Sequence, residues 1–227
     1  MSEVAVVFGA SGLVGAQVES ALLAREDVSR VISVARRAST HAHPKRAEII
    51  VPDFGKLDEA PPIEGALVAF VCLGTTIKTA GSESRFREVD HDYAVAAARL
   101  AARSGVRRLA LVSAIGADVK AATFYSRVKG ETERDVAGVA SWDALLILRP
   151  SLLLGERTER RSAERVGILI GRPLAGLMRG PLSPYRPVEA RTVARSMVNA
   201  LLATSGPLAR GHHVLTYDDM ARLAAAG

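Results

Sequence analysis

The chain has 227 residues, of which 48% are hydrophobic and 24% are charged. This length predicts one large domain or a domain with a small lobe, and this composition excludes a disordered or low-complexity chain. The single cysteine excludes an internal disulfide and a multi-cysteine zinc site, and no metal site is expected. The longest apolar run, residues 66–73, is too short to cross a membrane, and the N-terminus shows no signal peptide. We therefore expect a soluble, cytoplasmic protein.

The net charge of +6 is concentrated after position 150, where all eleven basic residues are arginine and six residues are acidic. Arginine binds carboxylates and phosphates, so an anionic substrate is one interpretation of this composition. A solvent-exposed, arginine-rich surface is the other interpretation. Aromatic residues make up only 4% of the chain, which disfavours nucleic-acid binding.

Short apolar segments alternate with longer helical ones over residues 1–150. Strands are predicted at residues 3–8, 31–35, 48–51, 66–73, 108–113 and 144–149, and helices at residues 13–24, 82–104 and 123–136. This alternation is typical of the α/β class, in which helices cover both faces of a doubly wound parallel sheet, the Rossmann fold.

The pattern changes after Pro150. A charged stretch at 157–165 and an apolar, glycine-containing one at 166–178 are followed by a loop at 180–187. A helix at 190–203, a short strand at 212–216 and a terminal helix at 218–226 complete the chain. We expect a single domain of residues 1–227, in which residues 150–227 form a small substrate-side lobe over the C-terminal edge of the sheet.

A glycine-rich turn follows the first predicted strand directly and opens a helix. Its glycines allow a tight turn, close approach of a pyrophosphate and close helix–strand packing, while free N–H groups at the helix start bind phosphate. A tight turn without a ligand is the alternative. The spacing G-x-x-G-x-x-G predicts a dinucleotide-binding site formed by Gly9, Ser11, Gly12, Leu13, Val14 and Gly15.

Two adjacent arginines, Arg36 and Arg37, follow the second predicted strand. Folds that bind NAD usually place a carboxylate here for the ribose 2′-hydroxyl, whereas folds that bind NADP supply cations for the 2′-phosphate. No Asp or Glu lies between Val28 and Ala47. The pair therefore favours NADP(H) as the cofactor, with surface charges as the alternative.

A serine, a tyrosine and a lysine have the spacing of a hydride-transfer site. Ser113 ends a predicted strand, and Tyr125 and Lys129 lie four residues apart on one face of a predicted helix. A carbonyl that receives hydride needs a proton donor, and a nearby ammonium together with the nicotinamide charge lowers the pKa of a tyrosine. We expect Ser113 to position the substrate oxygen, Tyr125 to act as acid and base, and Lys129 to tune Tyr125. Ordinary packing of these side chains is the alternative.

The glycine turn and the Ser…Tyr-x-x-x-Lys set resemble the short-chain dehydrogenase/reductase superfamily. More narrowly, the chain resembles its atypical branch of Tat-interacting-protein-like NAD(P)-binding oxidoreductases. The segments that carry this resemblance are CLGTTIKTAGS (72–82), FREVDHDY (86–93), VSAIGAD (112–118), FYSRVKGETE (124–133) and LRPSLLLGER (148–157). The Asn-Ala-Gly segment and the helix asparagine of many superfamily members have no clear match here.

The resemblance implies NADP(H) binding, with further contacts from three loops. Asp53 and Phe54 are expected beside the adenine, and Leu73, Gly74 and Thr75 along the cofactor. Near the nicotinamide we expect Arg149, Pro150, Ser151 and Leu152. It also implies that Lys129 holds the ribose. The expected function is NADP(H)-dependent carbonyl reduction or alcohol oxidation on a small molecule, without a nucleic-acid or membrane partner. A non-enzymatic NADP(H)-binding regulator or adaptor is the alternative.

Overall fold

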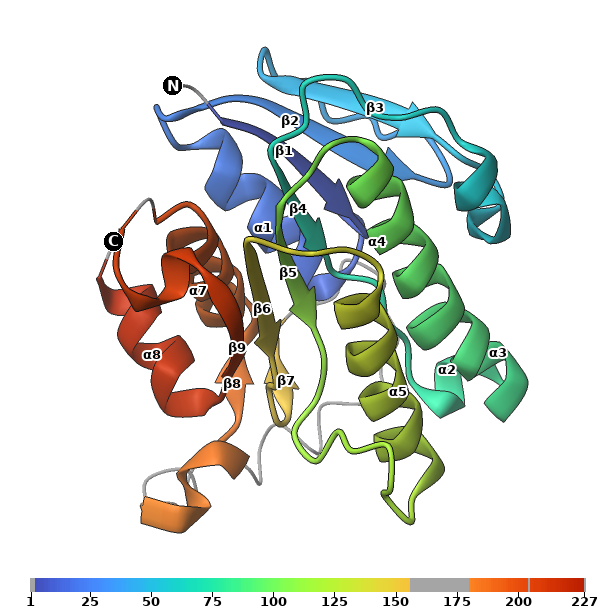
Figure 1. Cartoon of the computed structure of the whole chain (residues 1–227), viewed down its shortest axis with the longest axis vertical. Helices are drawn as coiled ribbons and strands as arrows, with labels where there is room; N and C mark the ends of the chain where they lie inside the picture. The colour runs from blue at the N-terminus through green and yellow to red at the C-terminus, as the bar shows by residue number, and fades with distance from the viewer. Residues whose placement is uncertain (1–2, 156–179, 204, 227) are drawn as a thin grey trace.

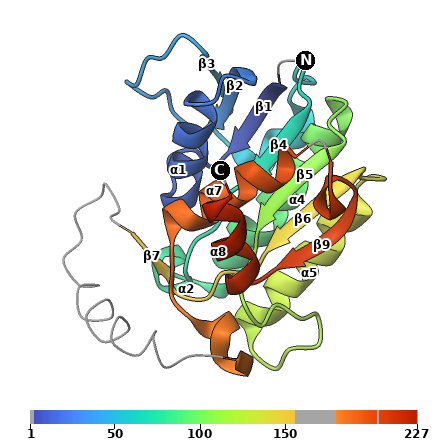
Figure 2. The same cartoon turned by 90° about the vertical axis from the view of Figure 1, so that its left-hand side faces the viewer.

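The computed structural model describes residues 3–155, 180–203 and 205–226, which form a parallel seven-stranded sheet between two helical layers (Figures 1 and 2). The strand order is β3-β2-β1-β4-β5-β6-β9, and every neighbouring pair is parallel. The strands are β1 (Glu3–Phe8), β2 (Val28–Ala35), β3 (Arg46–Ile50), β4 (Val68–Val71), β5 (Arg108–Val112), β6 (Ala144–Leu148) and β9 (Gly211–Leu215). The predicted Rossmann-type α/β fold is confirmed.

Each face of the sheet has its own hydrophobic core, because successive side chains of a strand point to opposite faces. In β1, Val6 and Phe8 face the layer of α4 (Tyr93–Arg103), α5 (Phe124–Gly138) and the 3-10 turn η1 (Phe54–Glu59). Ala5 and Val7 face the layer of α1 (Leu13–Leu23), α7 (Ala190–Leu201) and α8 (Tyr217–Ala225). Figure 1 shows these two layers on the right and left of the sheet.

The helix predicted at residues 82–104 is interrupted. After the short helix α2 (Ile77–Ala80), the chain forms α3 (Glu83–Arg87), a π-helical turn η2 (Glu88–Asp92) and then α4. A π-turn inserts an extra residue into the helical repeat, which the apolar spacing of a sequence does not reveal. This turn lies within the FREVDHDY motif at residues 86–93.

The described part of residues 150–227 is built largely into the main domain. Strand β9 extends the sheet beside β6, and α7 packs against α1. A two-stranded sheet of β7 (Leu153–Leu154) and β8 (Val188–Glu189) and two 3-10 turns, η3 (Gly180–Tyr185) and η4 (Pro207–Ala209), complete the region. The segments at 157–165 and 166–178 lie outside the described residues, so the predicted substrate-side lobe stays a prediction.

The strand order reverses between β1 and β4. From β1 the chain runs outward through β2 and β3, then returns to place β4, β5 and β6 on the other side. In open α/β sheets, ligands bind in the crevice outside the carboxyl ends of strands at such a reversal. The loops that follow β1 and β4 therefore define the place of the candidate site. No helix of the described chain has the length and apolar character needed to span a bilayer.

Candidate cofactor-binding and active site

The turn after β1 depends on glycine at two positions. Gly9 has a φ of +87°, and a Cβ there would lie 2.8 Å from the Cys72 carbonyl oxygen after β4. A Cβ at Gly15 would lie 2.1 Å from the Gly9 oxygen, so only glycine allows α1 to start this close to β1. The Gly12 N–H donates to the Gly9 oxygen at 2.9 Å and closes the turn.

The first turn of α1 offers unpaired backbone donors. Gly12 is the N-cap residue and, lacking a side chain, makes no side-chain cap, and the first turn carries no acidic residue. The N–H groups of Leu13, Val14 and Gly15 have no acceptor within the helix, and the helix dipole adds partial positive charge. The backbone around Ser11 and Gly12 thus forms a cradle that fits a pyrophosphate.

Arg36 and Arg37 directly follow β2, the neighbour of β1 in the sheet. Both side chains are exposed. Neither forms an ion pair or a side-chain hydrogen bond with any residue in the described ranges. Two exposed guanidinium groups at this edge are compatible with a 2′-phosphate.

The loop after β3 holds Asp53 and Phe54. Asp53 caps η1 by accepting the Gly55 N–H at 2.9 Å. Phe54 is buried and packs edge-to-face on Tyr93, with ring centroids 6.0 Å apart. The Phe54 side chain therefore belongs to the hydrophobic core. In this loop, only the backbone and the exposed Asp53 side chain are available to contact an adenine.

The loop after β4 runs through Leu73, Gly74 and Thr75 past a buried ion pair. The Thr75 N–H donates to Asp90 Oδ2 at 2.7 Å, and Lys129 Nζ lies 2.7 Å from Asp90 Oδ1. Gly74 is exposed, and a Cβ on it would come within 3.3 Å of Asp90 Oδ1. The predicted cofactor loop and the predicted catalytic lysine thus meet at one carboxylate.

Helix α5 brings Tyr125 and Lys129 together, as their spacing predicts. Thr123 caps this helix by accepting the Ser126 N–H, and the Tyr125 ring packs on Phe86, with centroids 5.3 Å apart. Burial raises the pKa of Tyr125 above its ordinary value; the Lys129 charge lowers it and the Asp90 charge raises it. Burial and the Asp90 charge together outweigh the ammonium, so Lys129 by itself does not bring the pKa of Tyr125 below its ordinary value.

Ser113 makes its side-chain contact elsewhere on α5. Its hydroxyl is buried and donates to Glu133 Oε1 at 2.5 Å. Glu133 also accepts two hydrogen bonds from Arg149, from Nε at 3.0 Å and from Nη2 at 2.6 Å, which raise the pKa of Arg149. Glu133 lies eight residues after Tyr125, which is about 12 Å along a helix axis. The structure therefore holds Lys129 at Asp90 and Ser113 at Glu133.

The loop after β6 contains Pro150, Ser151 and Leu152. The buried Pro150 accepts the Ile115 N–H at 2.9 Å, and the Ser151 hydroxyl donates to the Arg186 carbonyl oxygen. Leu152 is 52% exposed and leads into β7. This loop is thereby fixed at the carboxyl ends of β5 and β6, the edge that also carries the glycine turn.

Sequence reasoning missed Asp90 and Glu133. Arg149, which the resemblance places near the nicotinamide, binds Glu133 in the structure. Glu133 carried a signal, since Tyr125, Lys129 and Glu133 repeat every four residues and so share one helix face. Asp90 carried none, because Glu88, Asp90 and Asp92 are all acidic and only the π-turn selects which one is buried.

A doubly wound sheet with a phosphate cradle at its reversal point defines a dinucleotide-binding protein of the Rossmann class. The model of the NAD(P)H-binding family matches residues 9–162. The chain belongs to this family, and its curated relatives place it in the Tat-interacting-protein-like, atypical short-chain dehydrogenase branch.

Two relatives align with most of the chain. The mitochondrial protein fmp52 of Emericella nidulans is 33% identical over 226 residues, covering 96% of this chain and 95% of its own. The rat protein HTATIP2 is 35% identical over 200 residues, covering 87% of this chain and 80% of its own. The expectation of a cytoplasmic protein is contradicted by relatives of this kind that are named mitochondrial.

A solved structure shares the fold at low sequence identity. The human epimerase family protein SDR39U1 with NADPH has a TM-score of 0.62 and 16% identity, with 94% of this chain and 74% of that chain covered. At this identity the match supports the architecture alone. The cofactor class, NAD(P)H, therefore comes from the family and from the phosphate cradle.

Proposed function

We propose that the protein is an NADP(H)-dependent oxidoreductase that interconverts a small carbonyl compound and its alcohol. The observation that supports this proposal is the placement of Tyr125 and Lys129 on one face of α5, with Lys129 against the loop that follows β4. That loop and the glycine turn after β1 adjoin each other at the carboxyl ends of neighbouring strands, where open α/β sheets bind ligands. A titratable hydroxyl and an ammonium at this place are suited to proton transfer beside a nicotinamide.

The residues that take part in the proposed reaction have separate roles. The backbone of residues 9–15 binds the pyrophosphate, and Arg36 and Arg37 bind the 2′-phosphate. The bound nicotinamide supplies or accepts the hydride. Tyr125 donates a proton to the carbonyl oxygen, and Lys129 holds the ribose. Ser113 has no role in this proposal, because its proton is donated to Glu133 and its lone pairs cannot bind a carbonyl oxygen.

The substitution Tyr125→Phe tests the reaction. It removes the proton donor and keeps the packing on Phe86, so the rate of NADPH oxidation with carbonyl substrates should fall by ~10²-fold or more. NADPH affinity, measured by calorimetry, should stay unchanged. Tyr217→Phe is the matched control, because a phenylalanine there retains the stacking under Arg186. A Tyr125→Phe variant as active as the parent would remove the proposed role.

A non-enzymatic NADP(H)-binding regulator or adaptor is the second candidate. It is favoured because two predicted catalytic groups already have partners within the protein: Lys129 is paired with Asp90, and Ser113 donates to Glu133. Cofactor binding without turnover across a broad carbonyl panel would select this candidate. The panel should pair anionic with neutral carbonyls of equal size, because an anionic substrate is the proposal that the arginine-rich C-terminal third supports.

A further inference from the structure

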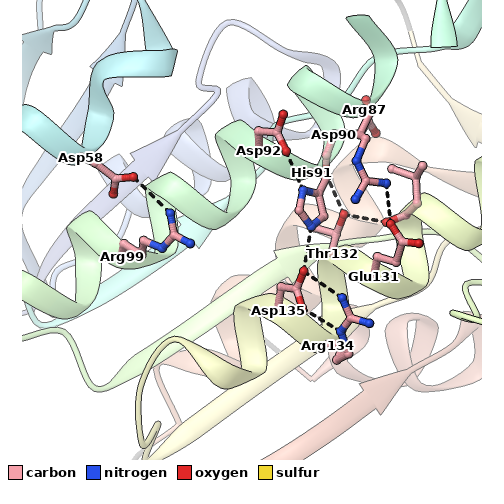
Figure 3. A network of polar contacts seen from close by, with 11 residues as sticks. Asp58, Arg87, Asp90, His91, Asp92, Arg99, Glu131, Thr132, Arg134 and Asp135 are labelled. Carbon is pink, nitrogen blue, oxygen red and sulfur yellow. Dashed lines mark hydrogen bonds and ion pairs between the residues drawn. The ribbon is translucent and has the colours of Figure 1, made fainter. Parts of the chain in front are cut away.

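Asp90 is a buried carboxylate held by three elements. It lies on the π-turn η2 with 1% of its surface exposed. Its backbone oxygen accepts the Thr132 hydroxyl of α5 at 3.1 Å (Figure 3), and its Oδ2 accepts the Thr75 N–H at 2.7 Å. These contacts fix both the backbone and the side chain of Asp90, so the direction of its second oxygen is set by the fold.

That second oxygen faces Lys129. Nζ lies 2.7 Å from Oδ1, and the two side chains are 7% and 0% exposed. The contact does not have hydrogen-bond geometry, so the pair is held by charge. Away from water, opposite charges at this separation interact strongly, whereas either charge alone is costly to bury. Lys129 is therefore bound to Asp90 before any cofactor arrives.

The same pair acts on Tyr125. Lys129 on its own helix and Asp90 on η2 are the charged groups whose fields act on the Tyr125 hydroxyl within the described residues. They act with opposite signs, and burial of the ring adds to the effect of Asp90. The ammonium, which alone would favour a phenolate, is neutralised by the carboxylate beside it.

We propose that Asp90 is a positioning residue that holds Lys129 and cancels its charge, which keeps Tyr125 a neutral phenol suited to donating a proton. This inference deepens the proposed function and rests on it for the role of Tyr125. During carbonyl reduction the Tyr125 O–H bond breaks and a new O–H bond forms on the substrate. The hydride comes from the reduced nicotinamide, and water later reprotonates Tyr125. The arrangement favours reduction, because alcohol oxidation needs a phenolate to accept the proton.

The direct test is the titration of Tyr125 in the cofactor-free protein, followed by phenolate absorbance. The chain has four tyrosines, and subtraction of the Tyr125→Phe titration isolates the signal. Asp90→Asn should lower the midpoint of Tyr125 by about one pH unit or more. Asp92→Asn removes the same charge from the same turn at a side chain that is 56% exposed, and it should leave the midpoint unchanged. An unchanged midpoint in Asp90→Asn, or an equal shift in Asp92→Asn, would overturn the proposal.

Asp90→Asn leaves a buried ammonium unpaired and can unfold, so a charge-balanced variant provides a second test. Lys129→Met with Asp90→Asn removes both charges, and Tyr125 should then titrate close to its midpoint in the parent. If the Lys129 charge acted on Tyr125 without compensation by Asp90, the titration midpoint of Tyr125 would instead rise clearly in this variant. Such a rise would contradict the cancellation.

These titrations involve neither substrate nor cofactor, so they separate the inference from the proposed function. Shifts as expected, together with no reduction of any carbonyl, would leave the role of Asp90 standing and remove the enzymatic activity. With an active protein, the Asp90→Asn variant should lose reductase activity at a lower pH than the parent. A purely structural role of Asp90 would lower the rate without moving the pH profile.

Discussion

Arg36 and Arg37 extend into solvent just beyond β2, without ion-pair partners among the described residues. A charge-assisted contact to phosphate contributes roughly 1.5–3 kcal/mol. Two such contacts would favour NADPH over NADH by about 10²-fold or more. Calorimetric titrations should show this preference, and it should weaken as salt increases because the arginines are exposed.

Replacement of both arginines by alanine should weaken NADPH binding and leave NADH binding nearly unchanged. Arg30→Ala is the control, since Arg30 is exposed on the same strand but near its opposite end. Equal affinities of the parent for the two cofactors would refute the assignment of Arg36 and Arg37.

Glycine substitutions test the phosphate cradle. A Cβ at Gly15 would lie 2.1 Å from the Gly9 oxygen, so Gly15→Ala must displace the turn from α1. We expect a loss of stability of about 2 kcal/mol or more and loss of cofactor binding. At Gly138, the last residue of α5, a Cβ would meet nothing within 4 Å. Gly138→Ala should therefore leave stability unchanged or raise it by up to ~1 kcal/mol. Thermal unfolding with and without NADPH measures the stability and the cofactor binding of both variants. A Gly15→Ala variant with unchanged stability and unchanged NADPH binding would contradict the proposed phosphate cradle.

At the scale of elements, a polar clamp joins η2 to α5. His91 lies between two carboxylates, with Nδ1 2.7 Å from Asp92 and Nε2 2.9 Å from Asp135 (Figure 3). Asp135 also accepts Arg134 Nε at 2.7 Å. Hydrogen bonds from Arg134, which contributes most, and from His91 lower the pKa of Asp135 to about 2, although partial burial raises it.

The clamp predicts a pH-dependent stability. Because the pKa of Asp135 is lower in the folded protein than its ordinary value near 3.8, the ionised carboxylate stabilises the fold at pH values above 3.8. This stabilisation is lost as the pH falls through about 2. Because the side chain is 32% exposed, solvent screening limits the effect to about 1 kcal/mol. Asp135→Asn should therefore be less stable at neutral pH and match the parent near pH 2. Asp143→Asn, at an exposed pair, should show no such pH-dependent difference. Denaturant unfolding at several pH values measures both.

The regular elements of residues 1–150 could be predicted, because apolar periodicity and glycine spacing are local signals. The π-turn could not, since the apolar residues Phe86, Val89 and Tyr93 keep the spacings of three and four residues that a regular helix also shows. Its consequence, the burial of Asp90 rather than Glu88 or Asp92, was equally hidden. The partner of Ser113 was missed for a related reason: Glu133 lies twenty residues further along the chain.

At the scale of the whole molecule, the fold class could be predicted from the order of strands and helices. The place of β9 in the main sheet, beside β6, could not. Its register partner β6 ends 63 residues before β9 begins, as in the pairing of Leu146 with His213. Such long-range pairing has no local signature. The predicted cytoplasmic location is contradicted by relatives named mitochondrial, because the composition and apolar pattern on which it rested do not specify a compartment.

The most direct test of the proposed function is the transfer of labelled hydride. The protein would be incubated with NADPH deuterated at the transferring carbon and a panel of anionic and neutral carbonyls, and the alcohols would be analysed by mass spectrometry. We expect deuterium on the carbinol carbon of at least one product with the parent, and a strongly reduced yield with Tyr125→Phe despite unchanged NADPH binding. Tight NADPH binding with no deuterated product from any carbonyl would contradict it.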